Sequence, residues 1–136
     1  MQPQLTKASP LLFIDACLAD NPLAIALQAV NYNAIACNKQ FPNATPDPTI
    51  IQWLALQGGI WITADEKAKR QHALEIKKAG VHVIWIKRSK NGMNAKNQLL
   101  LILWIIDPIL QEISRAKRPC YFIGDYNGLR PRYMPC

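Results

Sequence analysis

Short apolar runs alternate with longer amphipathic stretches along this chain of 136 residues. Runs of four to six apolar residues that end at polar or glycine positions are typical of buried parallel strands. Longer stretches with apolar positions three and four apart are typical of helices. The predicted strands are residues 11–16, 34–37, 60–64 and 81–86. The predicted helices are residues 23–30, 49–57, 66–79 and 95–116.

Local signals mark where these elements begin and end. Asp20-Asn21-Pro22 combines a capping side chain with proline in the first turn, so a helix is expected to begin there. Gly58-Gly59 predicts the end of the helix over residues 49–57. Pro108 predicts a kink in the long C-terminal helix, and Asn127-Gly128 predicts a tight hairpin turn.

Alternating strands and helices imply βαβ crossovers and a mainly parallel sheet. We therefore expect a single three-layer α/β domain over residues 11–136, with the C-terminal hairpin at the edge of its central sheet. Residues 1–10 are polar and contain two prolines, so we expect a flexible N-terminal segment there. Candidate sites in such a fold lie beyond the carboxyl ends of the strands.

Composition places the chain among globular proteins, because half of its residues are hydrophobic. The longest apolar run, residues 99–106, is far shorter than the about 20 residues of a membrane span. The polar first ten residues do not resemble a signal peptide. We expect a cytoplasmic protein whose four scattered cysteines are free thiols, with Cys17 and Cys37 as small core residues.

Charge is distributed unevenly along the chain. Residues 1–60 carry two basic and three acidic side chains, a net charge of −1, whereas residues 61–136 carry fourteen basic and six acidic ones, a net charge of +8. A basic half beside an acid-bearing half suits a polyanion held over a metal site. The alternative is a basic surface that only keeps the protein in solution.

Three aspartates are the strongest candidates for chemistry. Asp15 ends the first predicted strand and Asp65 the third, so both point to one edge of a parallel sheet. Asp47 opens the helix before the third strand. The course of the loop over residues 41–46 decides at which end of the sheet Asp47 lies. Converging carboxylates repel one another unless a divalent cation neutralises them, and oxygen ligands favour Mg²⁺ or Mn²⁺. Such a site can activate water beside a phosphate.

Each aspartate also has a structural explanation. Asp47 and Asp65 could each do no more than cap the helix that follows, and Asp20 is expected to be only a cap. Asp15 is harder to explain in this way, because a carboxylate that closes a buried apolar run is costly without a partner.

Two segments resemble a known family. FIDACL at Phe13–Leu18 and DPTIIQWLALQGGIWITAD at Asp47–Asp65 are similar to PIN-like domains, especially the VapC-like toxins and their relatives. The shared pattern is an aspartate after the first strand, an acidic residue that opens a helix, and a Thr-x-Asp after the next strand. The resemblance covers roughly residues 11–90.

The resemblance implies a Mg²⁺-dependent endoribonuclease, the toxin of a type II toxin–antitoxin pair. Asp15, Asp47 and Asp65 would hold the metal, and Thr63 would orient the catalytic site through its hydroxyl. Many family members have a fourth acidic position that finds no clear match here, and Glu66 and Asp20 are the only nearby substitutes. The alternative is a catalytically silent PIN-like module that binds RNA or a protein.

Two predicted helices carry residues that could bind a partner, one through basic side chains and one through apolar ones. Lys67, Lys69 and Arg70 follow Asp65 and are expected to contact RNA phosphates, unless they form only a solvated face. His72 is expected to be structural or on the surface. The strip at residues 99–106 is expected to be a core helix, and Leu101 and Trp104 could form a homodimer interface or the contact with a cognate antitoxin.

Overall fold

The computed structural model describes residues 9–88 and 92–136, which form one α/β domain around a six-stranded sheet. The strands are β1 (Leu12–Ile14), β2 (Ala34–Ala36), β3 (Ile60–Thr63), β4 (His82–Ile86), β5 (Tyr121–Asn127) and β6 (Arg130–Met134). The helices are α1 (Asp20–Ala29), α2 (Cys37–Gln40), α3 (Asp47–Gln57), α4 (Glu66–Ala79) and α5 (Ala95–Arg115).

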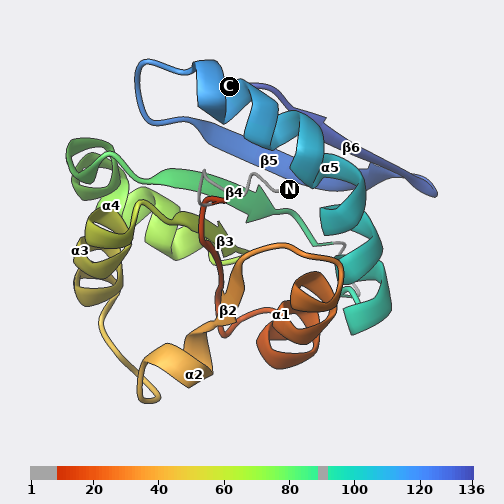
Figure 1. Cartoon of the computed structure of the whole chain (residues 1–136), viewed down its shortest axis with the longest axis horizontal. Coiled ribbons are helices and arrows are strands. Elements are labelled where there is room, and N and C mark those ends of the chain that lie inside the picture. Colours follow the sequence, from red (N-terminus) through yellow and green to blue (C-terminus); the bar gives the residue numbers. More distant parts are fainter. Residues whose placement is uncertain (1–8, 89–91) are drawn as a thin grey trace, which may run out of the picture.

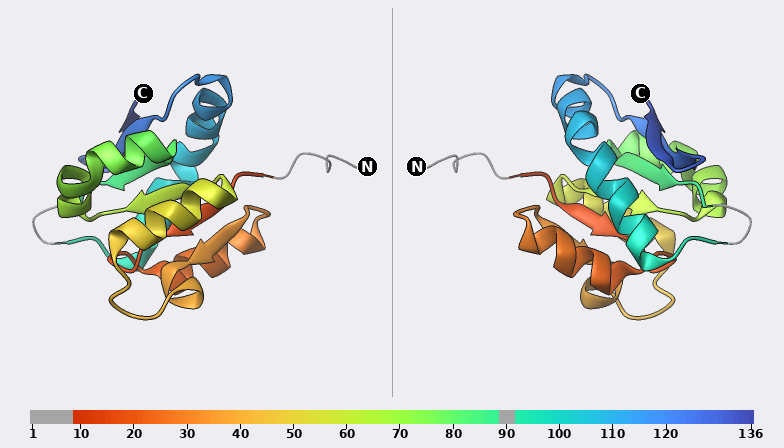
Figure 2. Two further views of the ribbon diagram at one scale, coloured as in Figure 1. Left: turned by 90° about the vertical axis from the view of Figure 1, so that its left-hand side faces the viewer. Right: turned by 90° about the vertical axis from the view of Figure 1, so that its right-hand side faces the viewer.

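Helices cover both faces of the sheet, as Figures 1 and 2 show. Helices α1 and α5 pack on one face through a large apolar core that includes Leu27 and Ile105. Helices α3 and α4 pack on the other face, around Phe13 and Trp61. Strands β1 and β3 are buried throughout because helices lie on both sides of them. The predicted three-layer α/β architecture is confirmed.

The strand order is β2-β1-β3-β4-β5-β6, and every neighbouring pair except the last is parallel. Strand β6 runs antiparallel to β5 and forms the predicted hairpin at the edge of the sheet. Gly128 in its turn has a φ of +65°, a backbone conformation that glycine adopts at low cost.

The predicted helix ends agree with the structure. Gly58 ends α3 in the left-handed conformation, with a φ of +64°, where a Cβ would be unfavourable. The Asn94 side chain caps α5 by accepting a hydrogen bond from the Asn97 N–H at 2.8 Å. Pro108 lies inside α5, which continues to Arg115 and bends along its length in Figure 1.

One short helix was missed by the sequence patterns. The second strand was expected to include Cys37, but β2 ends at Ala36 and α2 begins at Cys37. The carboxylate of Asp20 accepts a hydrogen bond from the Asn38 N–H at 3.2 Å, which helps to hold the chain in a helical turn. This contact joins two separate segments, so a local pattern could not reveal it.

Two further expectations concern the ends of the chain and membranes. Residues 1–8 of the predicted flexible segment lie outside the described residues. Among the described helices, none has both the length and the apolar character needed to cross a membrane.

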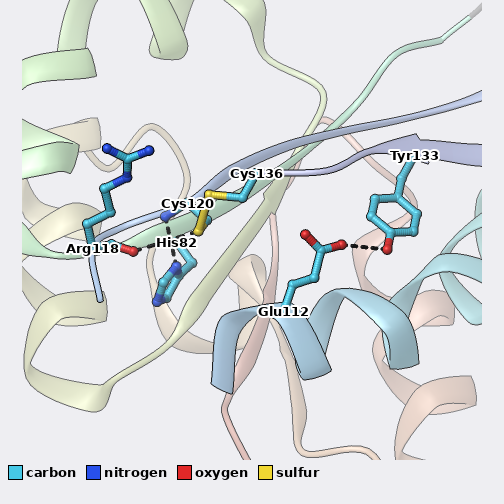
Figure 3. The surroundings of a disulfide bond; sticks show 6 residues. All are labelled: His82, Glu112, Arg118, Cys120, Tyr133 and Cys136. Carbon is cyan, nitrogen blue, oxygen red and sulfur yellow. Dashed lines mark hydrogen bonds between the residues drawn. A yellow bond between two sulfur atoms is a disulfide. The ribbon is translucent and has the colours of Figure 1, made fainter. Parts of the chain in front are cut away.

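The expectation of four free thiols is wrong for two cysteines. Cys120 and Cys136 form a disulfide, whereas Cys17 and Cys37 are free. Figure 3 shows the disulfide beside Arg118 and His82. Cys120 precedes β5 and Cys136 follows β6, so the antiparallel pairing of the hairpin brings the two residues together.

Breaking this disulfide should weaken the fold. The bond closes a loop with a sequence separation of 16, for which the chain-entropy argument gives about 3 kcal/mol of stability. We expect reduction with dithiothreitol to lower the free energy of unfolding in urea by about this amount. Cys136→Ser is the control, because reductant should have no further effect on it. An equal response of both proteins would contradict this role of the disulfide.

His82 connects the disulfide region to β4. Its Nδ1 accepts a hydrogen bond from the Cys120 N–H at 2.9 Å, which requires the neutral imidazole. Burial lowers the pKa of this half-buried histidine below its ordinary value of 6.5. The unfolded chain therefore takes up the proton first as the pH falls.

Stability should consequently depend on pH through His82. Above pH 6.5 the imidazole is neutral in both states, whereas acidification below that value favours unfolding. We expect the melting temperature to fall more between about pH 7.5 and about pH 5.5 in the wild type than in His82→Asn. The asparagine keeps an acceptor but does not titrate. Equal losses in the two proteins would contradict this assignment.

Candidate functional site

Asp15 and Thr63 meet where β1 and β3 end. The Asp15 N–H donates to the Ile62 carbonyl at 2.9 Å and so continues the parallel ladder by one bond. The Thr63 hydroxyl, in a residue that is only 3% exposed, donates to Asp15 Oδ2 at 2.6 Å. The Ala16 N–H donates to the other oxygen, Oδ1, at 2.8 Å. These donors satisfy and orient the carboxylate at the edge of the core.

The same hydroxyl connects Asp15 with Asp65. The Asp65 N–H donates to Thr63 Oγ1 at 3.0 Å, so Thr63 links the backbone of one aspartate to the side chain of the other. Asp65 Oδ1 accepts a hydrogen bond from the Lys67 N–H at 2.9 Å. Asp65 therefore does cap α4, as one of its two interpretations predicted, while it also lies beside Thr63.

Asp47 lies at the same end of the sheet as Asp15. Both aspartates line a cavity of about 350 Å³ together with residues of α2 and of the loop before α3. Asp47 is the first residue of α3, and no side chain caps this helix. The interpretation of Asp47 as a simple helix cap is therefore wrong.

The charges of Asp15 and Asp65 both act on the Asp47 carboxylate. The pKa of Asp47 is raised above its ordinary value of 3.8, first by burial and then by the negative charges of Asp15 and Asp65. His72 opposes these effects, since its Nε2 lies 3.9 Å from Asp47 Oδ2. The fold thus concentrates negative charge at one edge of the sheet, where a cation would relieve it.

The carboxylates do not form a ready-made metal cluster. Within residues 9–88 and 92–136, no three His, Cys, Asp or Glu side chains are grouped closely enough to hold an ion. Charge–charge interaction reaches much farther than a metal–oxygen bond of about 2 Å, which explains why the charges interact without forming such a group. Asp15, Asp47 and Asp65 supply the oxygen chemistry of a Mg²⁺ site, but binding by all three requires their side chains to move.

Both substitutes for a fourth acidic ligand are engaged in other contacts. Asp20 accepts hydrogen bonds from the N–H groups of Asn21 and Asn38, at 3.0 and 3.2 Å. Glu66 forms an ion pair with Arg70 at 3.0 Å. The expectation that Asp20 only caps α1 is wrong, because the preceding residue is the N-cap and no side-chain cap hydrogen bond is made there. Asp20 instead joins α1 with α2.

Cys17 is partly buried against the core, as expected, and it also borders the site. Its Sγ lies 3.5 Å from Thr63 Oγ1 and accepts a hydrogen bond from the Ala64 N–H at 3.2 Å. Burial and the charge of Asp15 raise the pKa of the Cys17 thiol, so it stays protonated near neutral pH. Cys37 is buried as expected, and its pKa is raised to about 11, mainly by burial.

Arg88 is a basic residue of the site that the sequence patterns missed. Its guanidinium donates to the Cys17 carbonyl at 3.0 Å, next to the sulfur that contacts Thr63. It follows β4 with only Lys87 between, and the parallel sheet brings this strand end to the same edge as Asp15 and Asp65. The sequence signal that could have identified Arg88 is its position just after a predicted parallel strand.

The predicted basic residues of α4 are less closely tied to the site. Lys67 is exposed beside Asp65, and Arg70 is paired with Glu66. The structure does not describe the side chain of Lys69. Whether these residues contact RNA remains a prediction.

His72 also approaches the site, although it was expected to have no such role. It interrupts α4 with a non-helical φ of −121°, and its ring lies between Asp47 and Glu75, with Nδ1 3.3 Å from Glu75 Oε1. Histidine at this position has no sequence signal that distinguishes it from an ordinary surface residue.

The expected partner surface on α5 is only partly exposed. Leu101 is fully buried in the core, whereas Trp104 is 68% exposed. Leu100 lies one turn before Trp104 and is also exposed. Trp104 therefore remains a candidate contact residue, and Leu101 does not.

No family model, curated protein or solved structure matches the chain.

Removing the Thr63 hydroxyl should destabilise the protein. Thr63→Val keeps the shape but leaves the Asp15 carboxylate and the Asp65 N–H without this partner, which costs about 2 to 3 kcal/mol. Thr63→Ser keeps the hydroxyl and loses only a methyl group, about 1 kcal/mol. Urea unfolding of the three proteins measures both values. A serine variant as unstable as the valine variant would show that packing, not the hydroxyl, matters here.

Proposed function

We propose that the chain is a PIN-like, metal-dependent endoribonuclease and the toxin of a type II toxin–antitoxin pair. The observation that carries the proposal is the position of the three aspartates at the carboxyl edge of the parallel sheet, where Asp15 and Asp47 line one cavity and Thr63 joins Asp15 to Asp65. These are the acidic positions of the family pattern, in the same order. The Thr-x-Asp element also supports the proposal, because Thr63 contacts both flanking aspartates.

The cation of this proposal is Mg²⁺ or Mn²⁺. Asp15, Asp47 and Asp65 would hold it, since hard divalent ions prefer carboxylate oxygens and the site has excess negative charge. When bound, the ion supplies an activated water and offsets charge on the phosphate. The Asp65 carboxylate accepts the Lys67 N–H through Oδ1 and could still bind an ion, since a carboxylate offers several lone pairs on its two oxygens.

The chain's own residues would position the RNA. Thr63 holds the Asp15 carboxylate in one orientation, which keeps the acidic site organised without substrate. Lys67 is exposed two residues after Asp65 and Arg88 binds the Cys17 carbonyl, so both would offer positive charge near the carboxylates, and such charge attracts phosphates without reading sequence. The exposed Trp104 on α5 is the proposed contact with the antitoxin or with a second copy of the chain.

Asp15→Asn is the direct test of the nuclease proposal. Removing one carboxylate charge should lower cleavage of single-stranded RNA by at least about a hundredfold and weaken Mn²⁺ binding, measured by electron paramagnetic resonance. Asp107→Asn is the matched control, because Asp107 lies on α5 outside the site, where it accepts a hydrogen bond from Tyr32. If Asp15→Asn leaves both cleavage and Mn²⁺ binding unaltered, the proposal fails.

A silent RNA- or protein-binding module is the second candidate. It is favoured by the carboxylates that are engaged elsewhere, since Asp20 binds backbone N–H groups and Glu66 binds Arg70. In that case the wild type binds neither Mn²⁺ nor Mg²⁺ and does not cleave RNA. Binding would then depend on the basic residues and weaken with salt.

A further inference from the structure

A second feature shares the carboxylate edge: the cavity of about 350 Å³ that Asp15 and Asp47 line on one side. Asn38 on α2 and Phe41, Asn43 and Thr45 in the following loop also line it. In Figure 1, α2 and this loop lie beyond the lower end of β2. The metal proposal accounts for the two aspartates but not for the other side of the cavity.

The walls of the cavity are held in place by contacts of their own. Asp20 accepts a hydrogen bond from the backbone N–H of Asn38 at 3.2 Å. The Thr45 hydroxyl donates to the Pro42 carbonyl at 2.6 Å and closes the loop, while Ala44 takes a left-handed φ of +64°. A pocket whose walls are ordered before binding loses less entropy when a ligand enters.

An aromatic ring forms part of this wall. The Phe41 ring packs nearly edge-on against Trp53 and Phe13, with centroid distances of 5.4 and 5.9 Å. The Phe41 N–H donates to the Cys37 carbonyl at 2.9 Å. These contacts orient the ring, and an ordered aromatic side chain beside a pocket suits a flat ligand.

The charge of the lining excludes a phosphate from the cavity itself. All the lining residues are described, and they include two aspartates but no lysine, arginine or histidine. An anion inside would therefore meet only negative charge. A neutral group with hydrogen-bond donors and acceptors matches the two exposed asparagine amides, each of which offers both.

The size of the cavity limits the ligand further. Ligand pockets in proteins span about 300 to 1,000 Å³, so this one lies at the lower end. It suits one nucleobase with part of its ribose and is too small for a folded RNA element. Single-stranded RNA presents such bases, unstacked and with free hydrogen-bonding edges.

We propose that this cavity binds one unpaired nucleobase of an RNA strand and that Asn38 and Asn43 read its edge. The base would lie next to the phosphate that faces the carboxylates. The inference rests on the proposed nuclease function and adds to it a base-specific subsite.

Cleavage mapping on a single-stranded RNA pool of random sequence tests this subsite. The wild type is expected to prefer one or two bases at a single position beside the cleaved bond. In Asn38→Ala/Asn43→Ala this preference should shrink by roughly two- to tenfold, the worth of one or two neutral hydrogen bonds. Gln40→Ala is the matched control, because it removes an exposed amide from the same helix that does not line the cavity. It should keep the wild-type preference.

A binding measurement separates failure of the subsite from failure of the nuclease proposal. The four ribonucleosides carry no phosphate, so NMR titration with them reports on the cavity alone. Shifts of the Asn38 and Asn43 side-chain amides in the wild type support the subsite even if the chain cleaves no RNA. Cleavage with an unchanged base preference in the double variant overturns the subsite and leaves the nuclease proposal standing. If RNA is not cleaved and no nucleoside shifts these amides, both proposals fail.

Discussion

Parallel pairing of β1 with β3 places Ile14 opposite Ile62 and brings the next residues of both strands to one edge. There the buried Thr63 hydroxyl donates to the Asp15 carboxylate. A charged group at the edge of an apolar core needs such a donor, because an unpaired carboxylate is costly to desolvate. The hydroxyl also accepts the Asp65 N–H, so the local geometry of the acidic edge depends on this one side chain.

Negative charge lies close to that contact, and one arginine lies near it. Asp47 lines the same cavity as Asp15, and its pKa is raised by burial and by the nearby carboxylates. Arg88 reaches the Cys17 carbonyl from the end of β4. A site of this kind can attract a polyanion to its rim while it keeps an acidic centre for a cation.

Much of the fold and part of the site followed from local sequence. Short apolar runs predicted the buried strands, Gly58 predicted the end of α3, and Asn127-Gly128 predicted the hairpin. These predictions were correct because each feature depends on neighbouring residues. Asp15 and Asp65 could be placed at one edge from strand direction alone. The position of Asp47 could not be predicted in this way, because the loop before α3 determines at which end of the sheet it lies. The residues around it also belong to other elements.

What the sequence determined by itself was therefore most of the strands and helices, but not the short helix α2, together with the mainly parallel order and two of the three aspartates. Only the tertiary structure decided the Cys120–Cys136 disulfide, the contact of Asp20 with α2, the position of Arg88 and the cavity. These features join residues 16 to 71 positions apart. Hydrophobic periodicity describes which face of an element is buried, but it does not say which distant side chain packs against that face. The acidic edge was predictable because parallel strands end together, whereas its partners depend on how loops and helices close over it.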